Sequence, residues 1–474
     1  MSVPTLAARS KRGACVSIAS LMLLGVLTLG GCSMVPSYQP PALPLAKQFN
    51  AAPDSPAARG GQWWREFHSA ELDQLIARGL ASNFTLKAAL SRIAEARASA
   101  QVAGAAQYPA LNLGGNDQRQ NNYGTTPKRS VFAQATYEVD FWGKQRAAAD
   151  SADALATATA TVFDAQTLRM SLGASIADRY FEVLSLNDRL RLAQSIADDA
   201  RQVLELVQIQ ASQGAVSNLE VEQQRNAMQT FEAAMPPLRQ QRDLALYQLA
   251  VLVGAQPEGF HLHSDGLQTL QIPRPAAGLP IGLLRQRPDI QAAEARLKSA
   301  NFDVGVARAA FLPNLSLDLM GGVDTLAGGH LWSVLASLSQ PVFAGGQLKG
   351  QLHADQAHVE ELTSSYRESI IEALQDVETQ LSATRELDNS YALNHSAVDS
   401  AREAARLAQV RYRLGSTDFQ TLLVVERTQY QAEDTLLQVR LQHLQAAVGL
   451  FRALGGDFST PLLSSDSSAQ VAHP

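Results

Sequence analysis

Hydrophobic and polar residues alternate in two separate parts of the chain. In residues 131–141, 315–324 and 332–339, nearly every second side chain is apolar and those between are mostly polar. A period of two with one apolar face is typical of a half-buried strand. Runs of about 10 residues fit strands that cross a membrane, although soluble sandwich hairpins would show the same alternation. The sequence therefore predicts two β-hairpins, at about 108–142 and 312–343.

After each hairpin the pattern changes to one typical of very long helices. Lys144–Gln213 and Gln347–Leu414 contain no proline, and at 1.5 Å per residue each helix would reach roughly 100 Å. Each run ends at a glycine, Gly214 or Gly415, the residue type that most often terminates a helix. The sequence thus predicts two long helices, each followed by a tight turn.

A returning helix should begin directly after each turn. Ser217 with Glu220, and Thr417 with Gln420, have the spacing of a capping box at a helix N-terminus. Apolar residues of the second returning helix follow the 4-3-4-3 spacing of a coiled-coil seam. These residues are Leu437, Leu441, Leu444, Val448 and Phe451.

The two halves of the chain repeat one plan. Residues 105–113 match residues 309–317 at an offset of 204, the two turn glycines match at 201, and Gly254 matches Gly456 at 202. The offset changes only where turns are expected, which indicates an internal duplication. Each half should contain a helix, a hairpin, a very long helix, a tight turn and a returning helix.

The first 31 residues predict an export signal peptide. The positively charged stretch Arg9–Arg12 precedes an uncharged apolar run, Ala14–Leu29, and small residues follow. A plain N-terminal membrane helix is the alternative, but the run is marginal in length for one. The ending Leu-x-Gly-Cys is similar to the lipobox of bacterial lipoproteins, in which the cysteine is acylated. Cys32 is therefore the predicted lipid attachment site, and Ser33 after it permits transfer to the outer membrane.

Charge and cysteine content narrow the possibilities. The net charge is −6, which gives no support to nucleic-acid binding. Removal of the signal peptide leaves 36 Lys and Arg against 45 Asp and Glu, a net charge of −9. Cys15 leaves with the signal peptide, so the mature protein cannot form an internal disulfide.

Four membrane strands in one chain cannot close a barrel, because an open edge in lipid leaves backbone groups unpaired. Two chains would supply eight strands, whereas three would supply 12 and a wider lumen. We favour three, because polar residues on the strands suit a wet lumen. These residues are Gln134, Thr136, Glu138, Asp318 and Asp324.

Three further stretches carry a resemblance to a known family. Trp63–Phe67, Leu279–Ile290 and Ala307–Pro313 resemble the corresponding parts of TolC-like outer-membrane factors of the OprM and NodT type. The resemblance implies a mainly α fold with membrane β structure, in which a homotrimer forms a 12-stranded β-barrel continued by a long periplasmic α-helical barrel. It also implies a passive exit duct in the outer membrane, fed by an inner-membrane pump of the RND type through a periplasmic adaptor, in multidrug or other efflux.

The duplication and the resemblance together divide the chain into six segments. They are a signal peptide (1–31), an acylated, Pro-rich extended tether (32–62), a first repeat (63–260), an equatorial connector (261–284), a second repeat (285–456) and a flexible tail (457–474). Within the second repeat, Pro288 suits a first helical turn and Asp289 complements a helix N-terminus. We therefore interpret the stretch Arg287–Asp289 as structural.

The resemblance also implies a periplasmic end that is closed at rest. This end would lie near Gly214 and Gly415, which would also contact the adaptor. Related channels close it with an Asp and with an Arg three residues later; here Val424 occupies the acidic position and Arg427 the basic one. A simple Asp–Arg latch is therefore in doubt, and the alternative is that the nearby charges form a solvated face. The candidates for a replacement carboxylate are Glu426, Glu220 and Glu222.

Catalysis finds little support in the sequence. It contains no Gly-x-Ser-x-Gly, Walker or His-Glu-x-x-His motif, so we predict no enzyme and no cofactor other than the lipid. His261 and His263 lie in a polar loop, and His353 and His358 are five residues apart and share a helix face poorly, so no metal site is predicted. An adhesin-type coiled-coil lipoprotein of the envelope is the alternative function, and a self-contained porin would need more strands than this chain offers.

Overall fold

The computed structural model describes residues 33–50, 62–121, 125–156, 160–264, 266–275, 278, 280–326 and 328–456. The predicted signal peptide, the lipid attachment site Cys32 and the predicted C-terminal tail lie outside the described residues. The chain divides into two compact units. The first comprises Met1–Pro41, Ile93–Ala160 and Ala293–Tyr366, and the second comprises Ala42–Arg92, Thr161–Ala292 and Arg367–Pro474.

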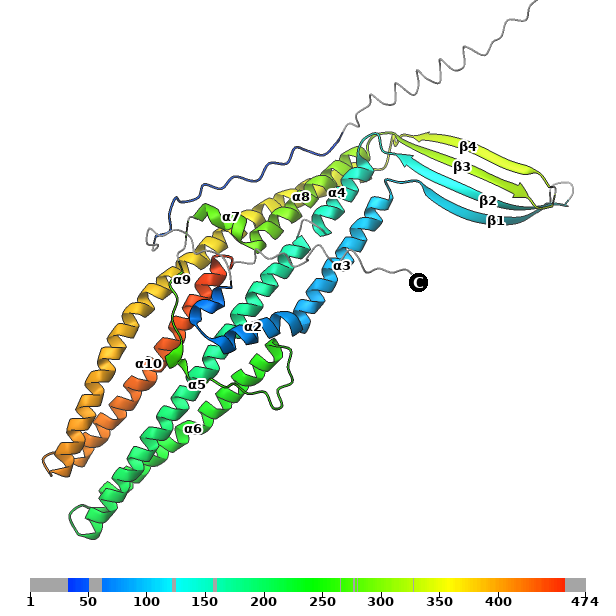
Figure 1. Cartoon of the computed structure of the whole chain (residues 1–474). Helices are drawn as coiled ribbons and strands as arrows, with labels where there is room; N and C mark the ends of the chain where they lie inside the picture. Colours follow the sequence, from blue (N-terminus) through cyan, green and yellow to red (C-terminus); the bar gives the residue numbers. More distant parts are fainter. Residues whose placement is uncertain are drawn as a thin grey trace, which may run out of the picture. The chain divides into compact units, whose positions relative to one another are not determined.

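The first unit contains one antiparallel sheet of four strands in the order β1-β2-β3-β4 (Figure 1). The strands are β1 (Ala110–Asn121), β2 (Thr125–Val139), β3 (Asn314–Asp324) and β4 (His330–Ser339). Both predicted hairpins are therefore confirmed. The central pairing, with Val131 opposite Val323 and Val139 opposite Leu315, joins one hairpin from each repeat into a single sheet.

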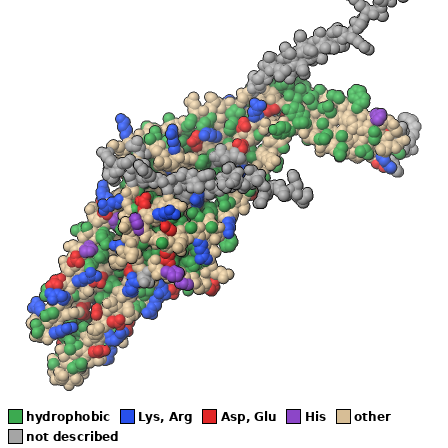
Figure 2. Space-filling view, in the orientation of Figure 1, with side chains coloured by type: hydrophobic (Ala, Val, Ile, Leu, Met, Phe, Trp, Pro, Cys, Tyr) green, Lys and Arg blue, Asp and Glu red, His purple; other side chains and the backbone are tan. Residues whose placement is uncertain are grey.

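One face of the sheet is apolar, because the register sets Leu111, Ala135 and Leu319 side by side on it. Figure 2 shows many hydrophobic and few charged side chains on the visible face of the strands, whereas charged side chains are spread over the helices. Large apolar side chains that are exposed on the strands include Leu111, Leu113, Val131, Leu319, Trp332, Val334 and Leu338. The outer edges of β1 and β4 have no neighbouring strand among the described residues, so both edges are available to strands of another chain.

Contacts between the repeats fix the base of the sheet. Trp142, just after β2, donates its indole N–H to the carbonyl oxygen of Pro313 at 2.7 Å. Two serine hydroxyls, Ser151 on α4 (Lys144–Ala156) and Ser299 on α8 (Pro288–Ala309), form a buried hydrogen bond of 2.9 Å. These bonds satisfy buried polar groups and tie the end of the first hairpin to the start of the second.

Of the two predicted long helices, Gln347–Leu414 is confirmed, whereas the stretch Lys144–Gln213 is described as two helices, α4 and a second helix of 53 residues. The long helices are α5 (Ala160–Ser212) and α9 (Gln347–Arg413), and the returning helices are α6 (Asn218–Leu252) and α10 (Phe419–Ala453). Helices α2 (Ala70–Ser82) and α3 (Phe84–Ala105) belong to the first repeat, whereas α7 (Leu283–Gln286) precedes α8 in the second. The three remaining elements are short 3-10 helices at Trp63–Phe67, Leu267–Thr269 and Pro280–Gly282. No helix of the described residues is both long enough and apolar enough to cross a membrane.

Aromatic rings form the centre of the second unit's core. Trp63 stacks on Phe451 of α10 with ring centroids 5.5 Å apart, and Phe67 lies 5.0 Å from Phe181 of α5. Leu444, Val448 and Phe451 of the predicted seam are buried here, which confirms that part of the 4-3-4-3 pattern. The stretch Trp63–Phe67 therefore has a packing role in which it joins α5 to α10.

Each repeat has a joint where the returning helix ends beside the start of another helix. Gly254, after α6, has φ +67°, and a Cβ there would lie 2.7 Å from the Ser82 carbonyl oxygen. Gly455, after α10, has φ +96°, and its Cβ would lie 2.8 Å from the Gln286 carbonyl oxygen. The counterpart of Gly254 is therefore Gly455. The predicted match to Gly456 was wrong by one residue, because both joints use the same offset of 201 as the tips.

Candidate functional site

The two helical tips have the same backbone geometry. Gly214 has φ +73° and Gly415 has φ +67°, a left-handed conformation that L side chains rarely adopt. The N–H of Gly415 donates to the Tyr412 carbonyl, and the N–H of Ser416 donates to the Arg411 carbonyl, at 2.9 and 2.8 Å. The same two bonds recur at Gly214. Each long helix therefore ends in a Schellman motif, at the glycine that the sequence predicts.

The returning helices begin with different caps. The backbone N–H of Ser217 donates to the Glu220 carboxylate at 2.7 Å, which is the Glu half of the predicted capping box. At the second tip the cap residue is Asp418, whose carboxylate accepts the Thr421 N–H at 2.7 Å. The prediction that Thr417 caps this helix was wrong by one residue, because an aspartate carboxylate is a strong cap in its own right.

Apolar side chains join the two tips within the second unit. Tyr412 of α9 lies 5.7 Å from the Phe419 ring of α10, and its hydroxyl donates to the Gln210 side chain of α5 at 3.3 Å. The buried members of this tip cluster are Leu204, Val207, Val221, Ala408, Tyr412, Phe419 and Leu422. Since α5, α6, α9 and α10 all contribute, the two hairpins are held laterally by one small core.

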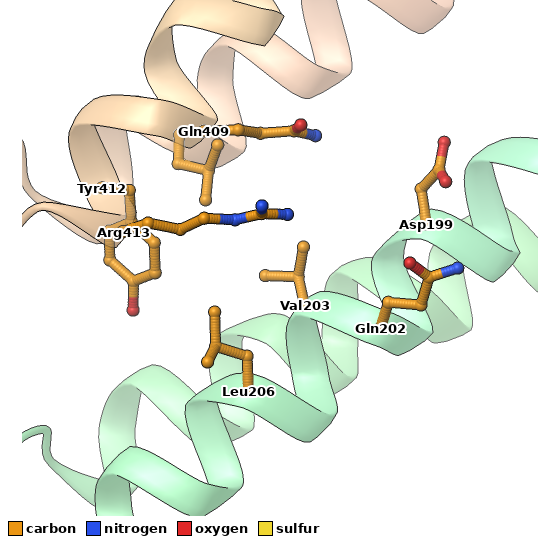
Figure 3. A pocket seen from close by; sticks show the side chains of 8 residues that line it. Asp199, Gln202, Val203, Leu206, Gln409, Tyr412 and Arg413 are labelled. Carbon is orange, nitrogen blue, oxygen red and sulfur yellow. The ribbon is translucent and has the colours of Figure 1, made fainter.

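A cavity of about 370 Å³ lies beside the tip cluster, between α5 and α9 (Figure 3). Figure 3 shows Gln409 and Arg413 extending from α9 towards the Asp199 and Gln202 side of α5. The lining is completed by Val203, Leu206, Tyr412 and Leu422. Burial raises the pKa of Asp199, and the neighbouring carboxylates of Asp198 and Glu433 raise it further.

Glu426 lies on the inner side of α10, among the helices of its own chain. Its side chain is only 9% exposed and accepts a hydrogen bond from the Gln409 amide at 3.4 Å. Burial raises the pKa of Glu426, the carboxylate of Asp199 also raises it, and the bond from Gln409 opposes this shift. Glu426 therefore faces α9 and α5 within its own chain.

Val424 and Arg427 lie on the opposite, exposed face of α10. Val424 is 54% exposed, and Arg427 is exposed with no hydrogen bond or ion pair to another described residue. They belong to an exposed stripe at helical spacing, which also contains Gln420, Thr421, Thr428, Gln431 and Thr435. Arg427 is the single charge in this stripe.

The two first-repeat candidates, Glu220 and Glu222, have different surroundings. Glu220 is used in the cap of α6. Glu222 is 63% exposed and forms an ion pair of 2.8 Å with Arg225 one turn later. An exposed pair of this kind contributes little to stability, so the carboxylate of Glu222 can change partners at small cost.

Two ion pairs that the sequence does not predict link the long helices to α10, at positions farther from the tips. Arg189 of α5 contacts both carboxylate oxygens of Asp434 of α10, at 2.6 and 3.1 Å. Arg402 of α9 contacts Glu433 of α10 at 2.6 Å. The residues of the first pair are 245 positions apart in the sequence, so no spacing rule would have paired them.

The joint of the second repeat contains a buried charge. Arg287 donates to Asp289 at 2.6 Å, to Asp376 at 3.2 Å and to the carbonyl oxygen of Ala453 at 3.2 Å. Burial lowers the pKa of Arg287, but the two carboxylates outweigh it and the net shift is upward. These contacts agree with a structural interpretation of Arg287–Asp289, because Arg287 links the start of α8 to the end of α10.

No group of three or more His, Cys, Asp or Glu side chains in the described part of the chain could hold a metal ion. His261 and His263 lie in the loop after α6, where the two rings are 5.3 Å apart. The backbone N–H groups of His263 and Ser264 donate to the Glu71 carboxylate. This loop therefore has a structural contact with α2.

Comparisons with known proteins agree with the geometry. Residues 75–255 and 279–456 match the family model described as "Outer membrane efflux protein". The pyoverdine export outer membrane protein OpmQ of Pseudomonas aeruginosa is 36% identical over 94% of this chain and 98% of its own length.

Solved structures show the same fold. The outer-membrane channel OprN superposes with a TM-score of 0.83 at 27% identity, covering 90% of this chain and 99% of its own. The open state of the MtrE outer-membrane channel of Neisseria gonorrhoeae gives 0.82 at 27% identity, with 90% and 98% covered. Mainly helical folds with two repeats, each carrying long helices and a β-hairpin, are thus common to these chains.

Proposed function

The chain belongs to the outer membrane efflux protein family, and from that premise we propose that it is a lipid-anchored exit duct closed at its periplasmic end by the exposed stripe of α10. The family consists of transport channels without enzymatic activity. The protein is the outer-membrane channel of a tripartite efflux pump, it is trimeric, and it extends into the periplasm. The alternative of an adhesin-type structural lipoprotein is therefore excluded.

The observation that carries the gate is the exposure of Val424 and Arg427 on an otherwise uncharged stripe. In a closed trimer three copies of this stripe meet, and three Arg427 side chains would repel one another unless each finds a carboxylate. Glu426 is buried in its own coil and Glu220 is engaged in a cap. We assign the partner role to Glu222 of a neighbouring chain, whose own ion pair with Arg225 is weak.

Conductance of the purified trimer in a planar bilayer tests this gate. Arg427→Ala should raise the mean conductance several-fold above that of the wild type, because it removes the charge that holds neighbouring chains together. Glu222→Gln should raise it as well, and the double variant should add little. Arg367→Ala, an exposed arginine elsewhere on α9, is the matched control and should leave the conductance unchanged. Equal conductance of Arg427→Ala and Arg367→Ala would contradict the gate.

Acylation of Cys32 is a second part of the proposal. The lipobox-like sequence before Cys32 supports it, and more than one acyl chain gives stable anchoring. The intact mass of the mature protein should exceed the mass of residues 32–474 by that of the lipid. Cys32→Ser should abolish the excess, and an unmodified wild-type chain would refute the anchor.

The tips are the proposed contact with a periplasmic adaptor, which joins the channel to an inner-membrane pump. Leu219 and Leu414 lie close to the turn glycines Gly214 and Gly415 and are 65% and 76% exposed, and exposed apolar side chains often mark interfaces. Leu414→Asp should reduce co-purification with the adaptor, whereas Leu393→Asp, equally exposed at 72% farther along α9, should not. Equal retention of the adaptor by both variants would move the contact elsewhere.

The name of one relative, a pyoverdine export protein, supports a proposal for the cargo. We assign this chain a cargo of the same kind. Expression of the chain in a Pseudomonas aeruginosa strain lacking that relative should restore pyoverdine in the medium, and the Arg427→Ala variant should serve as a leaky comparison. Failure to restore export by a protein that forms trimeric channels in bilayers would leave the duct intact and refute the cargo.

A further inference from the structure

The first described residues of the chain lie on α8, within the first unit (Figure 1). The Asn301 side-chain amide donates to the carbonyl oxygen of Pro36 at 2.8 Å, and the Lys298 ammonium lies 5.5 Å from the centre of the Tyr38 ring. A Cβ built on Gly305 would come within 2.6 Å of the Val35 side chain and 2.9 Å of its Cα. The segment 33–38 is therefore seated on α8, and Gly305 provides the close approach.

The equivalent surface of the first repeat lacks these features. At an offset of 204, the counterparts of Lys298, Asn301 and Gly305 on α3 are Ala94, Arg97 and Gln101. The glutamine at the close-approach position would fill the space that Val35 occupies. The alanine at position 94 carries no ammonium group that could lie over the Tyr38 ring. The duplication supplied two such helices, and one of them holds the N-terminal segment.

A cavity of about 520 Å³ begins where the described chain begins. Ser33 lines it together with Tyr137 at the end of β2, Phe141, Gln107 and Arg146. The remaining lining residues are Val35, Val139, Asp140, Gly143, Ala147, Asp150 and Phe302. All belong to the first unit.

The lining combines apolar rings and unused hydrogen-bond donors with two carboxylates, Asp140 and Asp150. Phe141 and Phe302 provide apolar surface. The side chains of Gln107, Tyr137 and Arg146 make no hydrogen bond to other described residues, and each is a donor. Such a site fits a ligand that has acceptor oxygens next to apolar chains, because unpaired donors are satisfied and apolar surface is buried together.

We propose that this cavity seats the glyceryl thioether of the lipid carried by Cys32, a site that rests on the proposed acylation. Cys32 directly precedes Ser33, which lines the cavity, and consecutive Cα atoms in a chain are about 3.8 Å apart. The ester carbonyl oxygens of the lipid accept from the three donors, and the first methylenes contact the two phenylalanine rings. The acyl chains thereby leave the protein at a fixed point beside the strands, instead of at the end of a free tether.

Photo-crosslinking in the full-length trimer tests the site. Phe302→p-benzoylphenylalanine places a photoreactive ketone in the cavity, and Phe311→p-benzoylphenylalanine, outside the cavity near the end of the same helix, is the control. After illumination and proteolysis, mass spectrometry should find position 302 joined to the lipidated peptide that begins at Cys32. Position 311 should not be joined to it.

Gly305→Val in the Phe302 probe protein should lower the crosslink yield at least fivefold, because the added side chain displaces Val35 and its neighbours. Gly104→Val is its match, since a Cβ at Gly104 meets nothing within 4 Å, and it should keep the yield. A crosslink to loose phospholipid only, or none to the Cys32 peptide, would overturn the site. The mass of the same peptide separates the two failures: a lipidated Cys32 without a crosslink removes the cavity alone, whereas an unmodified Cys32 removes the anchor as well.

Discussion

The joints of the two repeats solve the same backbone problem with different chemistry. In the first repeat, Asn83 caps α3 by accepting the Leu86 N–H and donates to the carbonyl oxygen of Leu252 at the end of α6. In the second repeat, at an offset of 204, Arg287 donates to the carbonyl oxygen of Ala453 at the end of α10. In the first joint a neutral amide binds the end of the returning helix, and in the second joint a buried guanidinium does so.

This difference shows where the two duplicated halves of the chain have diverged. The amide of Asn83 needs no counter-ion, whereas Arg287 requires Asp289 and Asp376. Breaking a buried ion pair from one side leaves an uncompensated charge, so the second joint tolerates less change. The repeats also differ at the tips, where the second repeat buries Glu426 and the first has the partly exposed Arg225 at the equivalent position.

Removal of the buried guanidinium should have the largest effect on stability. Arg287→Ala removes the charge-assisted hydrogen bonds to Asp289, Asp376 and the Ala453 carbonyl oxygen, and we expect a loss of about 3–5 kcal/mol. Thermal unfolding of the detergent-solubilised trimer, followed by circular dichroism, measures it. Arg285→Ala, an exposed arginine two residues earlier, is the control. A loss no greater than that of Arg285→Ala would break the proposed contrast between the joints.

Substitution of the joint glycines by alanine should have the second largest effect on stability. Gly455→Ala combines a left-handed backbone with a Cβ 2.8 Å from a carbonyl oxygen, for which we expect a loss of about 2–4 kcal/mol. Gly254→Ala should behave alike, since its geometry is the same. At the tips Gly415→Ala meets open space and should lose only about 1 kcal/mol. Similar melting temperatures for the Gly455 and Gly415 variants would show that crowding at the joint is unimportant.

The neutral joint should be less sensitive than the charged one. Asn83→Ala removes a cap and one hydrogen bond to Leu252, with an expected loss of about 1–2 kcal/mol. Denaturant unfolding of this variant beside Arg287→Ala gives the two values under one condition. An Asn83 effect equal to or larger than the Arg287 effect would reverse the comparison.

The smallest effect should be a gain in stability that depends on pH. The pKa of Glu426 is raised above its ordinary value of 4.5, first by burial and then by Asp199. A carboxyl with a raised pKa stabilises the fold in its protonated form, and that contribution is lost as the pH rises through the raised value. Glu426→Gln should therefore raise the melting temperature near neutral pH and change it little below about pH 4.

Glu403→Gln is the control for this pH dependence, because Arg406 lowers the pKa of that exposed carboxylate. It should give no gain near neutral pH. A gain for Glu426→Gln that persists unchanged in acid would mean that side-chain shape, and not charge, is responsible.

The sequence predicts features that depend on neighbours along the chain. The period-two pattern identifies both hairpins, and glycine with the following Ser217 and Glu220 identifies a tip. Local rules also mislead, because Pro236 and Pro237 lie inside α6, where a proline rule would end the helix. Burial of Met235 and Leu238, which flank the two prolines, outweighs the local cost.

Features that depend on distant residues could not be predicted. The partners of Arg287 lie 89 and 166 residues away, and the burial of Glu426 follows from α9 meeting α10. The seating of residues 33–38 on α8 was likewise hidden in a Pro-rich stretch that predicts an extended tether. In each instance the chemistry is visible in the residue type, but its partner becomes visible only in three dimensions.

Disulfide trapping at the tips tests the closed duct most directly. Val424→Cys introduces a thiol on the exposed stripe of α10, and Gln223→Cys introduces one at the equivalent position of α6. If three α10 stripes meet and close the channel, oxidation of the purified trimer should join Val424→Cys chains into disulfide-linked dimers, whereas Gln223→Cys chains should stay single. Dimers from Gln223→Cys and none from Val424→Cys would contradict the account, because the first repeat would then line the closed end.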